Sequence, residues 1–299
     1  MAPIVTVGMP VYNRQDVLRR ALRSIESQTL EDFLCLVVDD ASTVPIKPVV
    51  DEFDSRFRYV RNDQNRGCTG ARYTAFDQMD GEFLMGLDSD NEFFPWTLER
   101  ATRRLSERDD VDGVIGMSLF EGKQRVTVAD DELLVTPDYY ASRSWPVWDC
   151  HAIVRRGVVE EWATKRRDYY NCDFHFWLTF HLAHNSLFLD EPWGRHHVSG
   201  SDRITYSPDP RRFRDPVVFV DEHQPILGDT RCRPLDDWLK NMWFFLRRNR
   251  RKGEADVVRG WMNQRRVSTH GVTASRARRK VLDLLGDVVL DKSGQPDVL

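Results

Sequence analysis

Residues 83–91 read FLMGLDSDN, and this stretch frames the interpretation of the whole chain. A short apolar run ends in two acids, Asp88 and Asp90, which stand two positions apart. Pro95 follows soon after and can open a helix, so the run indicates a buried strand with both carboxylates at its C-terminal end. In open α/β sheets, ligands bind in the crevice outside the carboxyl ends of the strands. The stretch therefore predicts a ligand site at this edge of a sheet.

The paired acids suggest a divalent cation as part of that site. Mg²⁺ and Mn²⁺ prefer oxygen ligands, and one or two carboxylates often hold them while substrate phosphates complete the shell. The same residue types also form Asx-turns that cap helices, and the sequence leaves this alternative open. A calcium-binding EF-hand loop is excluded, because Phe93 stands where that loop requires glycine. The first hypothesis is a metal-assisted site for a phosphorylated ligand.

The composition is that of an ordinary soluble globular protein. Of 299 residues, 41% are hydrophobic and 30% are charged, and the net charge of −4 creates no basic field that would indicate nucleic-acid binding. No apolar run reaches the length of about 18 residues that could span a membrane. Because the chain enters a strand without a signal-peptide pattern and has no CxxC pair, we expect a cytoplasmic protein without a zinc knuckle or disulfide framework. The five cysteines are Cys35, Cys68, Cys150, Cys172 and Cys232.

The first 110 residues alternate between strand and helix patterns. Such alternation predicts a parallel sheet with right-handed crossovers. Asn13, Asp40 and Asp90 each stand at or just after the C-terminal end of an expected strand, so we expect them to emerge at one edge of the sheet. The expected strands are 4–13, 33–38, 58–61 and 83–87.

The crossover before the fourth expected strand carries two glycines and an arginine. Gly67 is expected to relieve a turn at the start of a helix. Gly67 and Gly70 do not form GxGxxG, so a dinucleotide-binding fingerprint is not indicated. Arg72, on the same helix, either faces solvent or reaches a phosphate, for which its forked donors are well suited.

Polar and aromatic residues of the second half offer an acceptor side. Trp148 and Asp149 combine flat aromatic faces with hydrogen-bonding groups, which suits a sugar acceptor as well as an ordinary core. Asp173 stands at the start of a helix, where it is either an N-cap or a general base. His197, after a strand expected at 186–189, is a candidate for a metal shell or a pyrophosphate contact. Basic residues then follow in an expected loop, which is either solvated or closes over phosphate: Arg203, Arg211, Arg212 and Arg214.

The last part of the chain changes in character. Residues 235–246 are rich in Trp and Phe at helical spacing, and a basic run follows at 247–252. This helix either lies on an anionic membrane surface or docks on the sheet domain or a partner chain. Leu282, Leu285, Val288 and Val289 predict one more helix near the C-terminus.

These segments together resemble family 2 glycosyltransferases of the GT-A fold. The matching segments are VTVGMPVYNR at 5–14, LVVDDAS at 36–42, NRGCTGAR at 65–72, FLMGLDSDN as a DxD motif, and CDFHFWL at 172–178 in place of an acid-rich ED motif. The resemblance implies a Rossmann-like, mostly parallel mixed sheet flanked by helices, with a C-terminal helical extension. It covers roughly the first 200 residues.

The resemblance also implies an inverting sugar transfer from a nucleotide-sugar, with a UDP-sugar favoured, to a saccharide or other hydroxyl acceptor. Mn²⁺ or Mg²⁺ would bind at Asp90 and Asp88, with His197 as a further ligand, and Asp173 would be the base. Cys172 stands where the family usually has glutamate. The expected donor-binding residues are Pro10, Tyr12, Asn13, Asp39, Asp40, Gly67, Arg72, Asp88 and Ser89, and the expected acceptor residues are Trp148, Asp149 and Trp177.

The expected domain organisation follows from the extent of the resemblance. Residues 1–200 would form the catalytic domain, with a nucleotide-binding half at about 1–110 and an acceptor half at about 111–200. Residues 201–299 would form an Arg-rich loop and a helical extension, through which we consider peripheral membrane contact; a homo-oligomer is a further hypothesis. A sugar-phosphate nucleotidyltransferase and a non-catalytic nucleotide-sugar-binding protein are the alternative functions.

Overall fold

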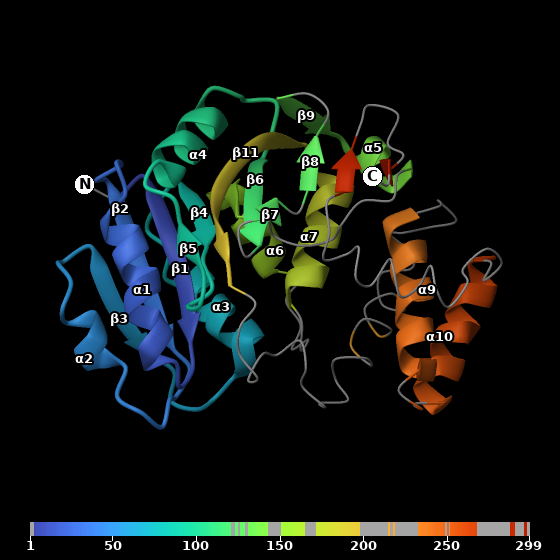
Figure 1. The fold of residues 1–299 in the computed structure, drawn as a ribbon, viewed down its shortest axis with the longest axis horizontal. Coiled ribbons are helices and arrows are strands. Elements are labelled where there is room, and N and C mark those ends of the chain that lie inside the picture. The colour runs from blue at the N-terminus through green and yellow to red at the C-terminus, as the bar shows by residue number, and fades with distance from the viewer. Residues whose placement is uncertain are drawn as a thin grey trace.

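The computed structural model describes residues 3–120, 123–124, 126–128, 131–142, 151–164, 172–197, 215, 218, 233–248, 250, 252–267, 288–290 and 296–297. In these ranges a central mixed sheet carries helices on both faces, and a helical pair lies to one side (Figure 1). Among the described helices, none has both the length and the apolar sequence that crossing a membrane requires.

The first half alternates strand and helix as expected. Its strands and helices are β1 (Val5–Val11), α1 (Gln15–Glu26), β2 (Phe33–Asp39), α2 (Lys47–Val50), β3 (Phe57–Arg61), α3 (Gly67–Asp77) and β4 (Phe83–Gly86). β1 pairs in parallel with β2 on one side and β4 on the other. β1 and β2 are largely buried along their length, which is typical of parallel strands with both faces covered.

The second half is less regular. Its elements are β5 (Glu92–Phe93), α4 (Thr97–Ser106), β6 (Gly113–Phe120), β7 (Lys123–Gln124), β8 (Val126–Val128), β9 (Glu132–Val135), α5 (Pro137–Ser142), β10 (Ala152–Arg155), α6 (Arg156–Ala163), α7 (Cys172–Ala183) and β11 (Ser186–His196). β10 inserts antiparallel between β4 and β6. The main sheet therefore runs in the order β3-β2-β1-β4-β10-β6-β11-β5, which confirms the mixed α/β fold class.

Strand β11 is longer than the sequence indicates. The expected strand ended at residue 189, but β11 continues to His196. Its register shifts on both sides of Pro192, so the proline is accommodated by irregular pairing with β6. At Gly194 a Cβ atom would collide with the backbone oxygen of Glu92, so only glycine lets β11 approach β5 this closely. The pairing of residues 192–196 with β6 and of residues 194–195 with β5 extends the strand beyond its expected end.

The helix expected near the C-terminus is wrong in the part that the structure describes. Val288–Leu290 forms strand β12, which pairs in parallel with β8 and antiparallel with β13 (Pro296–Asp297). Leu282 and Leu285 lie outside the described residues. Short apolar runs suit either structure, and here pairing with β8 decides the outcome.

The C-terminal helices α9 (Arg233–Arg248) and α10 (Lys252–Gln264) belong to the core of the second half. They pack on each other, and α9 also contacts α5. Their buried side chains join one hydrophobic cluster with Tyr140 and Trp177. Those side chains are Leu235, Leu239, Leu246, Ala255, Val258 and Met262.

Candidate active site

Three strand tips meet at one edge of the sheet. Because β1 is parallel to β2 and β4, the polar residues that follow these strands leave the sheet at the same end. They are Asn13, Asp40, Asp88 and Asp90, and we call them the tip cluster. This confirms the expected convergence of the tips.

Asn13 ties the tip of β1 to the tip of β2. Its backbone is left-handed, with φ at 55°, a conformation that asparagine tolerates better than most residues. Its side-chain Oδ1 accepts hydrogen bonds from the backbone N–H (2.7 Å) and the hydroxyl (3.1 Å) of Thr43. The backbone N–H of Asn13 donates to Ser42 Oγ (3.0 Å). The neighbouring Tyr12 side chain is 44% exposed and therefore accessible to a ligand. Pro10 lies in β1, opposite Val38.

The two acids at the end of β2 differ in their surroundings. Asp39 is fully buried and accepts hydrogen bonds from the Ser42 amide (2.8 Å), the Tyr59 hydroxyl (2.6 Å) and the Arg61 guanidinium. Burial alone would raise the pKa of Asp39, but these donors outweigh it and lower the pKa. Its carboxylate is thus engaged in holding the edge together.

Asp40 links β2 to helix α3. It is only 3% exposed, and its Oδ1 accepts from Asn62 Nδ2 (2.8 Å) and from the Arg66 amide (2.9 Å). The next residue, Gly67, starts α3 with a φ of 73°, so the expected turn requires the conformational freedom of glycine.

Each acid of the DxD motif is paired with an arginine from another element. Arg72 of α3 donates to Asp88 Oδ1 at 2.7 Å, and Arg14, just before α1, donates to Asp90 Oδ2 at 2.5 Å. Burial opposes ionisation of Asp88, but Arg72, His196 and Arg14 lower its pKa. Sequence reasoning missed Arg14, although it directly follows Asn13 in the VYNR segment.

The two carboxylates fit a divalent cation that shares its shell with a phosphorylated ligand. Their side chains are 37% and 21% exposed and offer hard oxygen donors, whereas Ser89, which stands between them in the sequence, is buried. Within the described ranges, no group of three or more His, Cys, Asp or Glu side chains is arranged to hold a metal. One or two protein carboxylates plus substrate phosphates commonly hold Mg²⁺, and Asp88 and Asp90 are the carboxylates that would contribute here.

The two consecutive histidines at the end of β11, His196 and His197, contact different residues. His197 Nε2 lies 2.6 Å from Glu92 Oε1. His196 Nδ1 instead lies 3.3 Å from Asn91 Nδ2, and the charge of His196 is one cause of the lowered pKa of Asp88. The sequence had singled out His197 through the resemblance to the family, and it did not indicate that His196, the last residue of β11, lies near Asn91.

His151 lies in the same neighbourhood and was also missed. It is buried, and burial, together with the charge of His196, lowers its pKa to about 3 despite the opposing effect of Asp88. Its backbone is left-handed, with φ at 54°, and its ring packs edge-on to Phe93 at 5.4 Å. A neutral imidazole is therefore expected at neutral pH.

The expected acceptor side is described only in part. Asp173 is the second residue of α7, and its side chain lies outside the described residues, as do Trp148, Asp149 and the four arginines at 203–214. Trp177 is buried in α7 and lines a small cavity of about 50 Å³ together with Arg72 and Gly86. This cavity thus lies between α7 and α3, the helix that carries Arg72.

Comparison with known proteins places this geometry in context. The sequence pattern of glycosyl transferase family 2 matches residues 6–162. The succinoglycan biosynthesis protein ExoW of Rhizobium meliloti is 38% identical over 112 residues, which are 35% of this chain and 35% of that protein. A Campylobacter jejuni GalNAc(5)-diNAcBac-PP-undecaprenol beta-1,3-glucosyltransferase is 33% identical over 109 residues, again 35% of each chain. The matched stretches thus span little more than a third of these relatives.

A solved structure shares the fold. S. aureus TarS 1–349, in a crystal structure with UDP-GlcNAc, superposes with a TM-score of 0.64 and 18% identity. The superposition covers 74% of this chain and 66% of that one.

Proposed function

Because the chain belongs to glycosyltransferase family 2 and has the GT-A fold, we propose that it transfers a sugar from a nucleoside diphosphate sugar, UDP-linked, to an acceptor hydroxyl with inversion. The observation that carries this proposal is the tip cluster, with the two acids of the DxD motif each beside an arginine. The similar TarS structure was solved with UDP-GlcNAc, which favours a UDP-sugar.

The donor side follows from the charges at the edge. A bound Mg²⁺ or Mn²⁺ would supply Lewis-acid neutralisation of the departing diphosphate. Asp88 and Asp90 would hold that ion, and Asp40 would orient the nucleoside beside the exposed Tyr12. Arg72, which donates to Asp88, would also lie close enough to the diphosphate to donate to a phosphate oxygen.

The acceptor side requires one base. In the proposed step, the acceptor oxygen bonds to the anomeric carbon as the bond from that carbon to the diphosphate oxygen breaks, and the acceptor proton passes to Asp173. Attack from the face opposite the leaving group inverts the anomeric carbon without a covalent enzyme intermediate. The position of Asp173 in the first turn of α7, a helix that contacts α3, supports this role.

A donor screen tests the proposed function. Purified protein is incubated with different nucleotide-sugars, with Mn²⁺, with Mg²⁺ and with a chelator, and slow hydrolysis is measured by release of nucleoside diphosphate. We expect metal-dependent hydrolysis of a UDP-sugar that is lost in Asp90→Ala. Asp109→Ala, which removes a fully exposed acid, is the matched control and should keep the rate.

Other outcomes of the screen would reject the proposal. Turnover of a nucleoside triphosphate with a sugar phosphate would identify a nucleotidyltransferase. Metal-independent binding of UDP without any hydrolysis or transfer would identify a binding protein.

We also propose that the C-terminal helices contact an anionic membrane surface. Trp243 lies between Arg247 (5.1 Å) and Arg259 (5.2 Å), and a basic group continues past the end of α9. That group, exposed in the structure, comprises Arg247, Arg248, Arg250 and Lys252. Two relatives are named for undecaprenol-diphosphate acceptors, which are lipid-linked. Basic and aromatic residues suit such an interface.

Vesicle flotation tests this contact. The protein should float with vesicles that contain phosphatidylglycerol and stay behind with pure phosphatidylcholine, and Arg247→Glu with Arg248→Glu should abolish flotation. Equal flotation with both kinds of vesicle would reject an electrostatic contact.

A further inference from the structure

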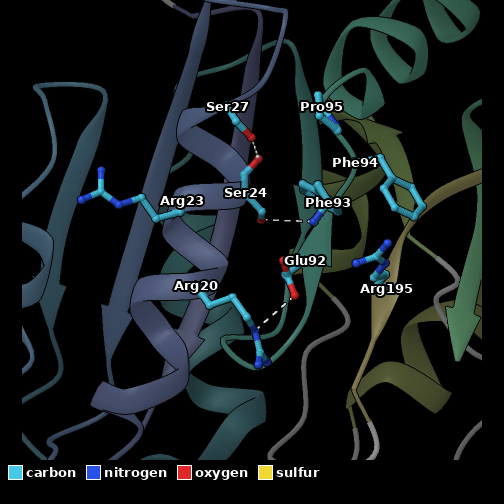
Figure 2. A pocket seen from close by; sticks show the side chains of 9 residues that line it. All are labelled: Arg20, Arg23, Ser24, Ser27, Glu92, Phe93, Phe94, Pro95 and Arg195. Atoms are coloured by element: carbon cyan, nitrogen blue, oxygen red, sulfur yellow. Dashed lines mark hydrogen bonds and ion pairs between the residues drawn. The ribbon is translucent and has the colours of Figure 1, made fainter. Parts of the chain in front are cut away.

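A hollow of about 320 Å³ lies on the α1 side of the sheet (Figure 2). Arg20 lines it from α1 and Ser27 from the residue after that helix. Glu92 and Phe94 line it from β5 and the residue after it, and Arg195 lines it from β11. No member of the tip cluster lines the hollow, so it is separate from the proposed donor site. Its volume is at the lower end of the range of about 300–1,000 Å³ that small-molecule sites occupy.

The hollow has more positive than negative side chains. Arg195 stands directly opposite Glu92 in the antiparallel pairing of β11 with β5. The Glu92 carboxylate, however, is held by Arg20 Nε at 3.2 Å and by His197 Nε2 at 2.6 Å. Among the described residues, Arg195 forms no ion pair, and its side chain lies at the wall of the hollow (Figure 2). Its charge is therefore available to an anion from solution.

Aromatic packing holds Arg195 in this position. Its guanidinium carbon lies 5.5 Å from the centre of the Phe94 ring, and Phe94 stacks in turn on Trp96 at 5.3 Å. An arginine stacked on a ring keeps its N–H edge free to form a fork with a carboxylate or phosphate. Gly194 is what allows β11 to bring this arginine beside β5.

The hollow is also joined to the DxD loop. Arg20, which holds Glu92, donates a further hydrogen bond of 2.8 Å to the backbone oxygen of Asp90. Arg20 would thus connect a ligand in the hollow to Asp90, the proposed metal ligand.

We propose that this hollow is a second binding site, which takes the phosphate or carboxylate group of an anionic saccharide through Arg195. Binding of a phosphate or carboxylate group is inferred from the charges and the volume of the hollow. The inference that this group belongs to a saccharide rests on the proposed function, because the acceptor or product of a glycosyltransferase can contain an anionic sugar.

Calorimetric titration at low ionic strength tests the proposal. The probes are inorganic phosphate, glucose 6-phosphate, glucuronate and glucose, each titrated with and without UDP and Mg²⁺ at saturating concentration. We expect the three anions to bind in both conditions and glucose not to bind. Arg195→Gln should weaken phosphate binding about tenfold, because it removes a charge-assisted contact.

Two further variants separate charge from folding. Arg195→Lys should keep part of the affinity, and Arg103→Gln, at an exposed arginine of α4, should leave it unchanged. Thermal unfolding of each variant shows whether it is folded.

Several results would overturn the proposal. They are phosphate affinity that is equal in the wild type and Arg195→Gln, loss of phosphate binding when UDP is present, and binding of glucose as tight as that of glucose 6-phosphate. If the wild type bound no UDP, the proposed function would fail, yet the titrations without UDP would still decide whether Arg195 holds an oxyanion.

Discussion

The two halves of the sheet bring residues to the candidate site by different routes. In the first half, consecutive parallel crossovers place the tips of β1, β2 and β4 side by side. In the second half, the neighbours are far apart in the chain: β4 pairs with β10, with Met85 opposite Ile153, and β5 pairs with β11, with Phe93 opposite Gly194. Site residues that follow strands joined by short crossovers can therefore be predicted from the sequence. Site residues that are placed by pairing between distant strands cannot.

The largest expected effect separates donor binding from acceptor activation. Asp173→Asn should lower turnover about a thousandfold, because an amide cannot take the acceptor proton. The affinity for UDP, set by the first half, should change less than about twofold. Steady-state transfer rates and calorimetric titration of UDP measure the two quantities. A near-normal rate would show that Asp173 only caps α7.

The next effect tests how firmly the first half holds its edge. Asp39→Asn should cost about 3 kcal/mol of unfolding free energy, because it removes a buried carboxylate that three donors share. Urea unfolding measures this loss. Asp63→Asn, at an exposed acid shortly after β3, is the control and should change stability by less than about 0.5 kcal/mol.

The same carboxylate predicts a dependence on pH. Because the pKa of Asp39 is lowered on folding, its contribution is fully present above its ordinary pKa of 3.8 and is lost as the pH falls towards the folded value. The stability difference between the wild type and Asp39→Asn should therefore shrink below that pH. A difference that stayed constant down to about pH 2 would contradict this reading.

A smaller effect tests the long-range pairing of the second half. Gly194→Ala should cost about 2 kcal/mol, because its Cβ would collide with the Glu92 backbone oxygen and the His151 ring. Thermal unfolding checks this, with Gly157→Ala in α6 as the control, since a Cβ there meets no atom within 4 Å. Equal melting temperatures for the two variants would mean that β11 and β5 are not so tightly apposed.

The smallest expected effect concerns the pairing of Arg14 with Asp90. Arg14→Gln should tighten binding of Mn²⁺ alone about fivefold, because the cation no longer displaces a guanidinium. Binding of UDP with Mn²⁺ should weaken by a similar factor, since a positive charge near the diphosphate is lost. Arg58→Gln, which breaks the surface pair with Asp80, is the control. A change of the same sign in both affinities would rule out this exchange of partners.

Much of the first half could be predicted from particular residues. Asn13, Asp40 and the DxD acids follow apolar runs, and parallel strands must release them at one edge. The need for glycine at position 67 was also predicted, as its φ of 73° confirms. The nucleotide, metal and base roles of these residues stay predictions until ligands are measured.

The amino-acid sequence by itself determined the fold class, the family and the edge at which carboxylates gather, because periodicity and strand-end chemistry are local properties. Only the tertiary structure decided that Arg14 faces Asp90, that His196 is one of the groups that lower the pKa of Asp88, and that Arg195 reaches a hollow beside β5. The first contact depends on the pairing of β1 with β4, and the other two depend on the register of β11. Register is set by packing between residues that are far apart in the chain, such as Phe93 and Gly194, and no short stretch of sequence encodes it.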